Sequence, residues 1–317
     1  MTCYNETVFT ENNSLKKIAL LFPGQGAQHV GMCKELFHAF RSFKEVIQKA
    51  EDAASLHISK LMFDGPEHLL TDTENAQPCL VAASIATLAV MREAIPDFSF
   101  HSTAGHSLGE YSALVSVGAL DFETAIRLVT MRGKLMKTAA AEGGMAAIIG
   151  LDHTTLQQCC NEQCVIANDN CPGQLVISGL PLGLADTMEK AKKAGAKMIK
   201  KLSVSGPFHS PWMTDAQERM KELLSSIVVN PFTIPYYPNT KAIPTIDETS
   251  VAQLLLNQIT GPVLFRETLL HMGLSEVTHF FEVGPGQVLS GLAKRTCPAI
   301  PCQTIHTGYD VEAIISV

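Results

Sequence analysis

The pentapeptide GHSLG at positions 105–109 constrains this chain more than any other stretch of its sequence. Residues 98–104 before it are typical of a strand, and residues 110–117 after it have the spacing of a helix. A serine on such a sharp turn needs small neighbours because the backbone is cramped, and the helix behind it directs free amides toward the serine. We interpret Ser107 as a nucleophile, and those amides as donors that stabilise the oxyanion of the tetrahedral intermediate formed by its attack. The alternative is an ordinary turn in which the serine caps the helix.

A nucleophilic serine needs a base, and the chain has 11 histidines. His209 lies in SGPFHSP, residues 205–211, a loop too rich in Gly, Pro and Ser to be a packed helix. It also follows the serine in chain order, as the histidine does in α/β-hydrolases. His106 is adjacent to Ser107, but in a tight turn its side chain points elsewhere. We predict His209 as the base.

A third residue usually orients the histidine. Four aspartates lie between the serine and the predicted base, namely Asp121, Asp152, Asp169 and Asp186. Their sequence contexts do not distinguish any of them. A neutral carbonyl that orients the imidazole therefore remains open.

Two further segments suit an acyltransferase site. The GQG loop at 24–26 follows a short apolar strand at 17–22, and its glycines allow the backbone to approach a ligand closely; the alternative is a plain strand-ending turn. Arg132 lies on an amphipathic helix predicted over 124–141. An inward arginine would need a carboxylate partner, but periodicity alone favours a solvated arginine on the outer face.

Composition bounds the class of protein. The chain has 317 residues, 46% of them hydrophobic and 17% charged, which predicts a globular α/β protein with a large core. The net charge of −7 argues against a nucleic-acid binder. The nine cysteines have irregular spacing, so we interpret the cluster Cys159, Cys160, Cys164 and Cys171 as small buried or half-buried residues rather than a zinc site, and expect a reducing cytosol.

The N-terminus predicts a cytoplasmic location. Residues 1–15 are polar, without a basic start or an apolar block, and read as a flexible tail rather than a secretory signal. The longest apolar runs are too short and too interrupted to span a bilayer. We expect no association with a membrane.

The remaining chain alternates short strands and helices. Over residues 143–204 this alternation suggests a compact α+β insert. Outside it we predict helices at 31–54, 77–95, 213–227 and 288–295 and a core strand at 278–283.

Several motifs together resemble one family, the malonyl-CoA:acyl-carrier-protein transacylases and the related acyltransferase domains of polyketide synthases. They run in the family's order from about residue 16 to 295: LFPGQGAQ (21–28), ENAQP (74–78), GHSLGEYSAL (105–114), MRGKLM (131–136), ANDNCPGQLVISG (167–179), SGPFHSP (205–211) and FEVGPGQVLSGLAKR (281–295). The resemblance implies an α/β-hydrolase-like core, residues 16–142 and 205–317, with a ferredoxin-like subdomain at 143–204.

The resemblance also assigns roles at the site. It places the nucleophile at Ser107, the base at His209 and the arginine that binds the malonyl carboxylate at Arg132. The oxyanion donors fall on the backbone N–H groups of Gln25 and Leu108, and Gln77 and Asn168 match positions near the pocket. In polyketide relatives, an aromatic residue at the position of Phe208 goes with malonyl rather than a 2-methyl substrate.

One position departs from the family. Bacterial relatives often carry Gln after the Pro-Val dipeptide, which is 262–263 here, whereas this chain has Leu264. In the family a backbone carbonyl at that position accepts a hydrogen bond from the histidine. A backbone role survives the change of side chain, so we expect the Leu264 carbonyl to orient His209.

The activity implied is transfer of malonyl from malonyl-CoA to acyl carrier protein by a monomer that needs no cofactor or metal. Lys200, Lys201, Lys294 and Arg295 are candidates for docking an acidic carrier, or are plain solvated surface. Two alternatives stay open on the same scaffold, an acyl hydrolase (thioesterase) and a trans-acting polyketide acyltransferase. A third is a binding protein without catalysis, against which the intact site residues argue.

Overall fold

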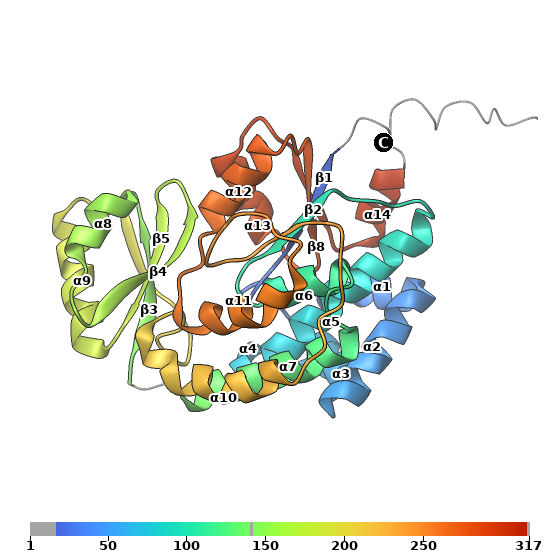
Figure 1. Cartoon of the computed structure of the whole chain (residues 1–317), viewed down its shortest axis with the longest axis horizontal. Coiled ribbons are helices and arrows are strands. Elements are labelled where there is room, and N and C mark those ends of the chain that lie inside the picture. The colour runs from blue at the N-terminus through green and yellow to red at the C-terminus, as the bar shows by residue number, and fades with distance from the viewer. Residues whose placement is uncertain (1–16, 140–141, 316–317) are drawn as a thin grey trace, which may run out of the picture.

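A parallel sheet forms the centre of the larger part of the molecule. The computed structural model describes residues 17–139 and 142–315, and shows two separate sheets with helices packed around them (Figure 1). The strand order of the parallel sheet is β7-β2-β1-β8-β9. Its strands are β1 (Ile18–Phe22), β2 (Ser102–Gly105), β7 (Tyr236–Tyr237), β8 (His279–Val283) and β9 (Cys302–Ile305).

The central strand β1 shows why this sheet lies inside. It pairs in parallel with β2 on one side and β8 on the other. Alternate side chains enter two different hydrophobic clusters: Leu20 and Phe22 enter one, and Ala19 and Leu21 enter the other. Helices cover both faces, so an almost purely apolar strand is what this position requires.

The helices of this part carry the loops of the site. They are α1 (Lys34–Ala39), α2 (Arg41–Ala54), α3 (Ile58–Asp64), α4 (Glu67–Thr71), α5 (Thr73–Ala94), α6 (Gly109–Ser116), α7 (Phe122–Thr138), α10 (Thr214–Ser225), α11 (Glu248–Thr260), α12 (Phe265–Leu274), α13 (Val288–Thr296) and α14 (Gly308–Ile315), with a 3₁₀ turn at Pro211–Met213. Helix α5 is buried along most of its length and packs against α2 and α7.

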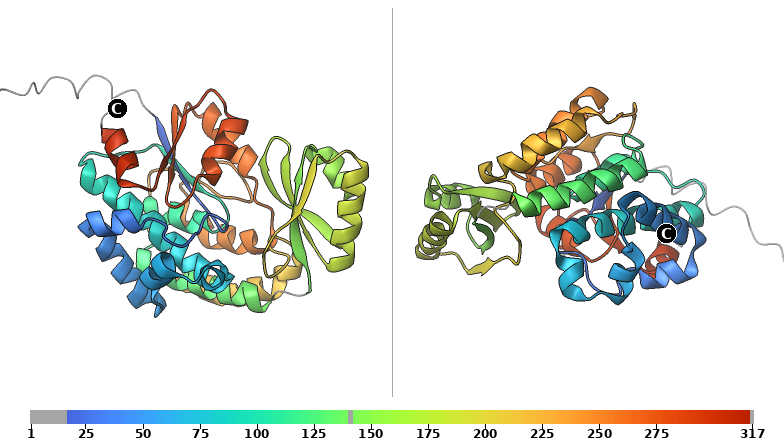
Figure 2. Two further views of the ribbon diagram at one scale, coloured as in Figure 1. Left: turned by 180° about the vertical axis from the view of Figure 1, so that it is seen from behind. Right: turned by 90° about the horizontal axis from the view of Figure 1, so that it is seen from below.

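The second sheet is antiparallel and lies to one side of the first (Figure 2). Its order is β4-β5-β3-β6, and the chain runs β3 (Gly144–Ile149), α8 (His153–Cys159), β4 (Cys164–Cys171), β5 (Gln174–Gly179), α9 (Pro181–Lys193) and β6 (Met198–Lys201). This sheet has a hydrophobic cluster of its own, which includes Ile148, Ile166 and Ile177. The predicted domain boundaries at 143 and 204 stay a prediction.

The two parts are joined along strand β4. Val263, in the loop before α12, donates its amide to the Ala167 carbonyl at 2.8 Å and accepts from the Asp169 amide at 2.9 Å. Asp169 also binds the guanidinium of Arg266 through Nε at 2.9 Å and Nη2 at 2.8 Å. The edge of the antiparallel sheet is thus covered by backbone from the other part.

Most predicted elements agree with these bounds, and three differ. The strand predicted over 98–104 begins only at Ser102, as β2. The single helix predicted over 31–54 is wrong, because Phe40 is extended and separates α1 from α2. The ring of Phe37 packs against those of Phe43 and Phe63, which the break makes possible. The predicted helix at 77–95 begins four residues earlier, with Pro78 inside it. Residues 1–15, the predicted tail, lie outside the described residues.

Candidate active site

Ser107 stands on a strained turn between β2 and α6. Its φ is 49°, a left-handed conformation that non-glycine residues rarely adopt and that concentrates at functional sites. The flanking glycines are required by space. A Cβ on Gly105 would lie 1.9 Å from the Gly109 backbone, and a Cβ on Gly109 would lie 2.1 Å from the Phe22 carbonyl oxygen. The turn predicted from the pentapeptide is therefore present, with the serine at its tip.

The structure brings Ser107 and His209 together. The Ser107 Oγ lies 2.7 Å from His209 Nε2. On the other side of the ring, His209 Nδ1 lies 2.8 Å from the carbonyl oxygen of Gln258. A carbonyl only accepts, so Nδ1 carries the proton and Nε2 is free to accept from the serine hydroxyl. The pair has the arrangement of a nucleophile and its base, with the base oriented by a third group.

The predicted orienting group is wrong. The Leu264 carbonyl accepts from Thr268, on the first turn of α12, rather than from the histidine. Gln258, six residues earlier in the last turn of α11, holds the ring instead. The four aspartates weighed from the sequence cap helices or bind other partners: Asp121, Asp152, Asp169 and Asp186.

Arg132 points inward from α7 and is 2% exposed, so the solvated arginine that periodicity favoured is wrong. Its Nη1 donates to Gln77 Oε1 and its Nη2 to Gln258 Oε1, each at 2.9 Å. Nη2 also lies 3.2 Å from Ser107 Oγ, and Nε has no partner. Within residues 17–139 and 142–315 no carboxylate forms an ion pair with this guanidinium. The cation therefore lies beside the serine, with hydrogen bonds to neutral oxygens and its Cζ 5.8 Å from the centre of the Tyr111 ring.

The side chain of Gln258 ties these groups together. Its Nε2 donates to the Ser107 carbonyl at 2.9 Å and to Glu110 Oε2 at 2.7 Å, while its Oε1 accepts from Arg132. The sequence reasoning missed both Gln258 and Glu110. The available signal was a polar residue inside the buried stripe of α11, where Leu255 and Ile259 are fully buried.

Asn239, which follows β7, fixes the turn itself. Its Oδ1 accepts from the Ser107 amide at 2.6 Å, and its Nδ2 donates to the Gly105 carbonyl at 2.7 Å. The side chain thus bridges the backbone on both sides of His106. The His106 ring turns away from the serine and meets Asn170 Oδ1 at 2.7 Å, as expected for a residue that is not the base.

Two backbone amides at the site have no acceptor. Gln25 and Leu108 lie in turns, and neither of their N–H groups makes a hydrogen bond within the described residues. Both residues line the same cavity as Ser107. Free amides beside a nucleophile are suited to an oxyanion.

The cavity over Ser107 has a volume of about 530 Å³. Its walls come from both parts of the molecule, with Phe208 and Met136 on one side and Met145 and Asn168 from the antiparallel sheet on the other. The predicted pocket residues therefore separate as follows: Arg132, Asn168 and Phe208 line the cavity, Gln77 lies behind Arg132, and Leu264 is absent from the lining.

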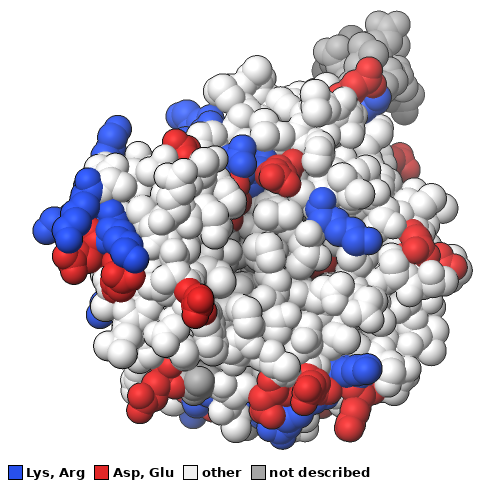
Figure 3. All heavy atoms as spheres, turned by 60° about the vertical axis from the view of Figure 1, so that its left-hand side comes forward, with Lys and Arg blue, Asp and Glu red and all other residues white. Residues whose placement is uncertain are grey.

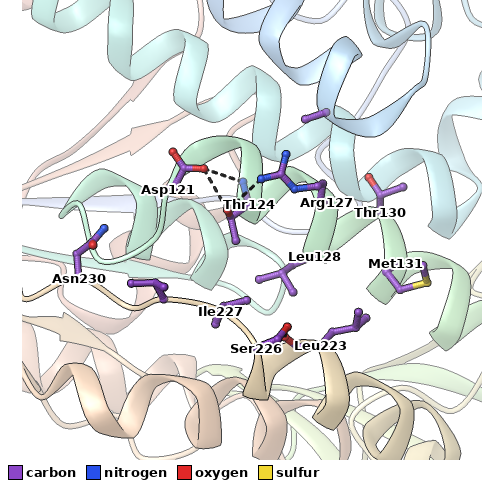
Figure 4. Close-up of a pocket in the computed structure, with 12 residues that line it drawn as sticks. Asp121, Thr124, Arg127, Leu128, Thr130, Met131, Leu223, Ser226, Ile227 and Asn230 are labelled. Carbon is purple, nitrogen blue, oxygen red and sulfur yellow. Dashed lines mark hydrogen bonds between the residues drawn. The ribbon is translucent and has the colours of Figure 1, made fainter.

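A second cavity, of about 700 Å³, lies on the outer side of α7 (Figure 4). Leu128 and Met131 of α7 face Leu223 and Ile227 across it. Its polar groups are largely engaged with one another: Thr124 accepts from Arg127. The candidate nucleophile and base, Ser107 and His209, line the first cavity and not this one.

Burial sets the protonation of the site. It lowers the pKa of His209 to about 3, with the positive charge of Arg132 as the second cause. The imidazole is therefore neutral near pH 7 and able to accept a proton. Burial also raises the pKa of the Glu110 carboxyl to about 7, against which its hydrogen bonds from Gln258 and Asn239 act.

The cysteines agree with the interpretation of small packed residues. Cys159, Cys164 and Cys171 are buried, and Cys160 is half-buried. In the part of the chain that the structure describes, no group of three or more His, Cys, Asp or Glu side chains is placed to hold a metal ion. Over the same part, no helix is long and apolar enough to cross a membrane.

Comparison with known proteins gives one consistent result. The model of the family described as acyl transferase domain matches residues 19–306. The malonyl CoA-acyl carrier protein transacylase of Bacillus subtilis (strain 168) is 43% identical over 291 residues, which cover 89% of this chain and 90% of that protein.

Solved structures are also similar. An acyl-carrier-protein S-malonyltransferase from Bartonella henselae superposes with a TM-score of 0.91 at 39% identity, covering 95% of this chain and 98% of that one. A malonyl-transacylase solved in complex with the acyl carrier protein of a type II polyketide synthase superposes with a TM-score of 0.92 at 34% identity, covering 95% and 99%.

Proposed function

The chain belongs to the acyl transferase domain family, and from that membership and the site geometry we propose that it transfers a malonyl group from malonyl-CoA to the phosphopantetheine thiol of acyl carrier protein. The names of its relatives support this activity. The observation that carries the proposal is Arg132, a buried cation beside the nucleophile whose hydrogen-bond partners are neutral.

The first half of the reaction loads the serine. His209 Nε2 takes the hydroxyl proton of Ser107 over their 2.7 Å contact, and Oγ attacks the thioester carbonyl of malonyl-CoA. The tetrahedral oxyanion lies against the free amides of Gln25 and Leu108. The carbon–sulfur bond then breaks, coenzyme A leaves with the proton from His209, and malonyl-serine remains.

The second half runs the same steps in reverse. The carrier's thiol gives its proton to His209 and attacks the malonyl-serine carbonyl. The carbon–oxygen bond breaks, Ser107 regains its proton, and the malonyl thioester of the carrier departs. The Gln258 carbonyl keeps the ring in one tautomer throughout, since Nδ1 stays bonded to it.

Arg132 selects the acyl group. A malonyl carboxylate would replace neutral contacts with a charge-assisted pair, worth about 1.5–3 kcal/mol or more when desolvated. An acetyl group leaves the buried cation without a directly bonded carboxylate, so rejection by on the order of 10²-fold follows. The carboxylate also offsets the charge that lowers the pKa of His209, which makes the base stronger once the correct substrate is bound.

The surrounding residues supply shape. Gln77 orients Arg132 through its 2.9 Å contact, and the Phe208 ring narrows the cavity against a 2-methyl group. Asn168 lies in the cavity wall, where we place it beside the pantetheine arm.

We further infer the larger arrangement of the molecule. Residues 16–142 and 205–317 would be an α/β-hydrolase-like core and residues 143–204 a ferredoxin-like subdomain whose β-α-β-β-α-β order supports the assignment. We expect a cytoplasmic monomer that supplies malonyl units to fatty-acid synthesis. A trans-acting role in polyketide synthesis is the competing use, supported by the relative solved with a polyketide carrier.

Carrier docking has candidate cations near the cavity. Lys200 and Lys201 are exposed on β6, directly before Leu202 in the cavity wall. In the view of Figure 3, Lys and Arg side chains gather with Asp and Glu at one edge of the molecule, and mostly uncharged atoms lie across the middle. We infer that Lys200, Lys201, Lys294 and Arg295 meet the acidic carrier.

Intact mass spectrometry tests the proposal. The protein is mixed with malonyl-CoA, and separately with acetyl-CoA, with the Ser107→Ala variant as control. We expect a malonyl adduct that needs Ser107, discharges onto carrier protein, and forms far more slowly with acetyl. Release of coenzyme A without an adduct would indicate a hydrolase. If no adduct forms and no coenzyme A is released, malonyl-CoA is rejected as the donor.

A further inference from the structure

Glu110 is a buried carboxylate for which the mechanism above has no use. It lies in the first turn of α6, three residues after the nucleophile, and is 0% exposed. Its Oε2 accepts from Gln258 Nε2 at 2.7 Å and from the backbone N–H of Asn239 at 3.1 Å. Its Oε1 has no partner. A charged group in such a place needs a reason, because burial penalises the ionised form.

The reason lies on the other side of Gln258. That amide donates to Glu110 and accepts from Arg132, so one side chain separates the buried anion from the buried cation. Both N–H groups of the amide are used, one on Glu110 and one on the Ser107 carbonyl. Its oxygen must therefore face the guanidinium. In the empty pocket the two charges balance through this amide.

A substrate carboxylate would disturb that balance. When it binds Arg132, two anions share one cation inside a region closed to solvent. Like charges at short range favour protonation of one of them. The malonyl carboxylate is the stronger acid and gains the direct contact, so Glu110 is the group that accepts the proton.

The other titratable groups nearby do not change charge near neutral pH. Burial raises the pKa of Tyr111 to about 12 and also raises that of Tyr236 at β7. Burial lowers the pKa of both His209 and His106, so these rings are neutral.

A second cation, which is bonded to α6 itself, lies at the end of the helix away from Glu110. Arg92 of α5 binds the Ser116 carbonyl at the far end of that helix. The Glu110 carboxyl, whose pKa burial raises to about 7, is therefore the group poised to titrate.

We propose that Glu110 is a proton-linked counter-charge to Arg132: it is ionised in the empty pocket and takes up one proton from solvent when the acyl carboxylate binds. This inference rests on the proposed function, because it needs a carboxylate-bearing acyl group. An acetyl group brings no charge and moves no proton, so the coupling is specific to an acyl group that carries a carboxylate.

Linkage fixes the sign of the effect. Above the pH at which Glu110 ionises in the empty enzyme, binding must draw a proton from solution, so affinity falls by up to about tenfold for each pH unit. Below that pH Glu110 already holds its proton, and affinity is flat. The acyl carboxylate itself stays ionised throughout this range.

Binding calorimetry on the Ser107→Ala protein tests the inference, with malonyl-N-acetylcysteamine as a ligand that lacks the titrating phosphates of coenzyme A. We expect uptake of about one proton per ligand at about pH 8.5, read from buffers of different ionisation enthalpy, and a Kd about tenfold higher at pH 8.5 than at pH 6.5. Adding Glu110→Gln should remove both effects. Adding Glu218→Gln, at an exposed position of α10, should remove neither.

The outcomes separate this inference from the function. If the wild-type protein is malonylated but the Ser107→Ala protein takes up no proton on binding the ligand, the proposed role of Glu110 is wrong. This outcome needs no variant at Glu110. Uptake that persists after Glu110→Gln also overturns that role. A wild-type protein that is never malonylated overturns the function and the inference together.

Discussion

Two arginines, Arg132 on α7 and Arg266 on α12, meet very different partners. Arg266 is 30% exposed in its side chain and grips the buried carboxylate of Asp169 with two nitrogens. Arg132 is more deeply buried, yet its partners are the amide oxygens of Gln77 and Gln258 and the Ser107 hydroxyl. Burial alone would favour the opposite assignment, because the deeper cation has the greater need of an anion.

The difference distinguishes a contact that is complete within the chain from the carboxylate-binding site that we propose. The pair of Arg266 and Asp169 is complete within the chain and joins α12 to β4. The contacts of Arg132 hold its planar group in place and leave it without a direct carboxylate partner within the described residues. A protein that keeps such a cation beside a nucleophile is prepared for a ligand carboxylate.

The largest effect is expected from disrupting that proposed site. Arg132→Ala should lower kcat/KM for malonyl loading by about 10³-fold, since the carboxylate loses its partner in both ground and transition states. Acetyl loading should change by less than about tenfold. Single-turnover mass spectrometry with both donors measures the ratio. If Arg266→Ala changed that ratio as much, the distinction between the two arginines would collapse.

A smaller effect is expected from the structural pair. Asp169→Asn keeps the shape but removes the charge, so the free energy of unfolding should fall by about 1–3 kcal/mol. Urea denaturation measures it, and the donor ratio should be unchanged. Glu189→Gln breaks the exposed pair with Lys193 and should leave the free energy of unfolding unchanged, because solvent screens both charges. Equal losses in the two variants would mean that burial of Asp169 adds nothing.

The smallest effect is expected at Lys200 and Lys201, exposed cations that neither bind the acyl group nor pair with a buried carboxylate. Lys200→Glu with Lys201→Glu should raise KM for the carrier protein about tenfold at low salt and less at high salt, because exposed charges steer association. The rate of malonyl loading from coenzyme A should stay the same. Stopped-flow transfer assays with a Lys192→Glu control on α9 measure it. Unchanged transfer would remove β6 from the docking surface.

Local sequence explains why the turn that carries Ser107 was predictable. A strand, two crowded glycines and a helix are encoded within a few residues around Ser107, and steric demand alone fixes the turn. His209 was predictable for a related reason, since its loop excludes a helix. The inward direction of Arg132 came from family resemblance, because periodicity on α7 favoured the surface.

Distant contacts explain what was missed. Gln258 lies 151 residues from Ser107, and a glutamine on an amphipathic helix reads as a surface residue until the fold buries it. Glu110 was hidden in the same way inside a family motif. Strand β7 has only two residues, too few for any alternation to be visible. The predicted acceptor, the Leu264 carbonyl, lies just before α12, whereas the observed acceptor, the Gln258 carbonyl, lies six residues earlier in the last turn of α11.

The backbone hydrogen bonds between Val263 and strand β4 protect this edge of the antiparallel sheet from aggregation. An uncovered edge strand offers unpaired N–H and C=O groups to other chains. Here the core covers the β4 edge through the Ala167 and Asp169 contacts, while the opposite edge, β6, carries the adjacent charges of Lys200 and Lys201. The antiparallel sheet cut out of this chain would keep one protected edge and expose the other, and is expected to self-associate through β4.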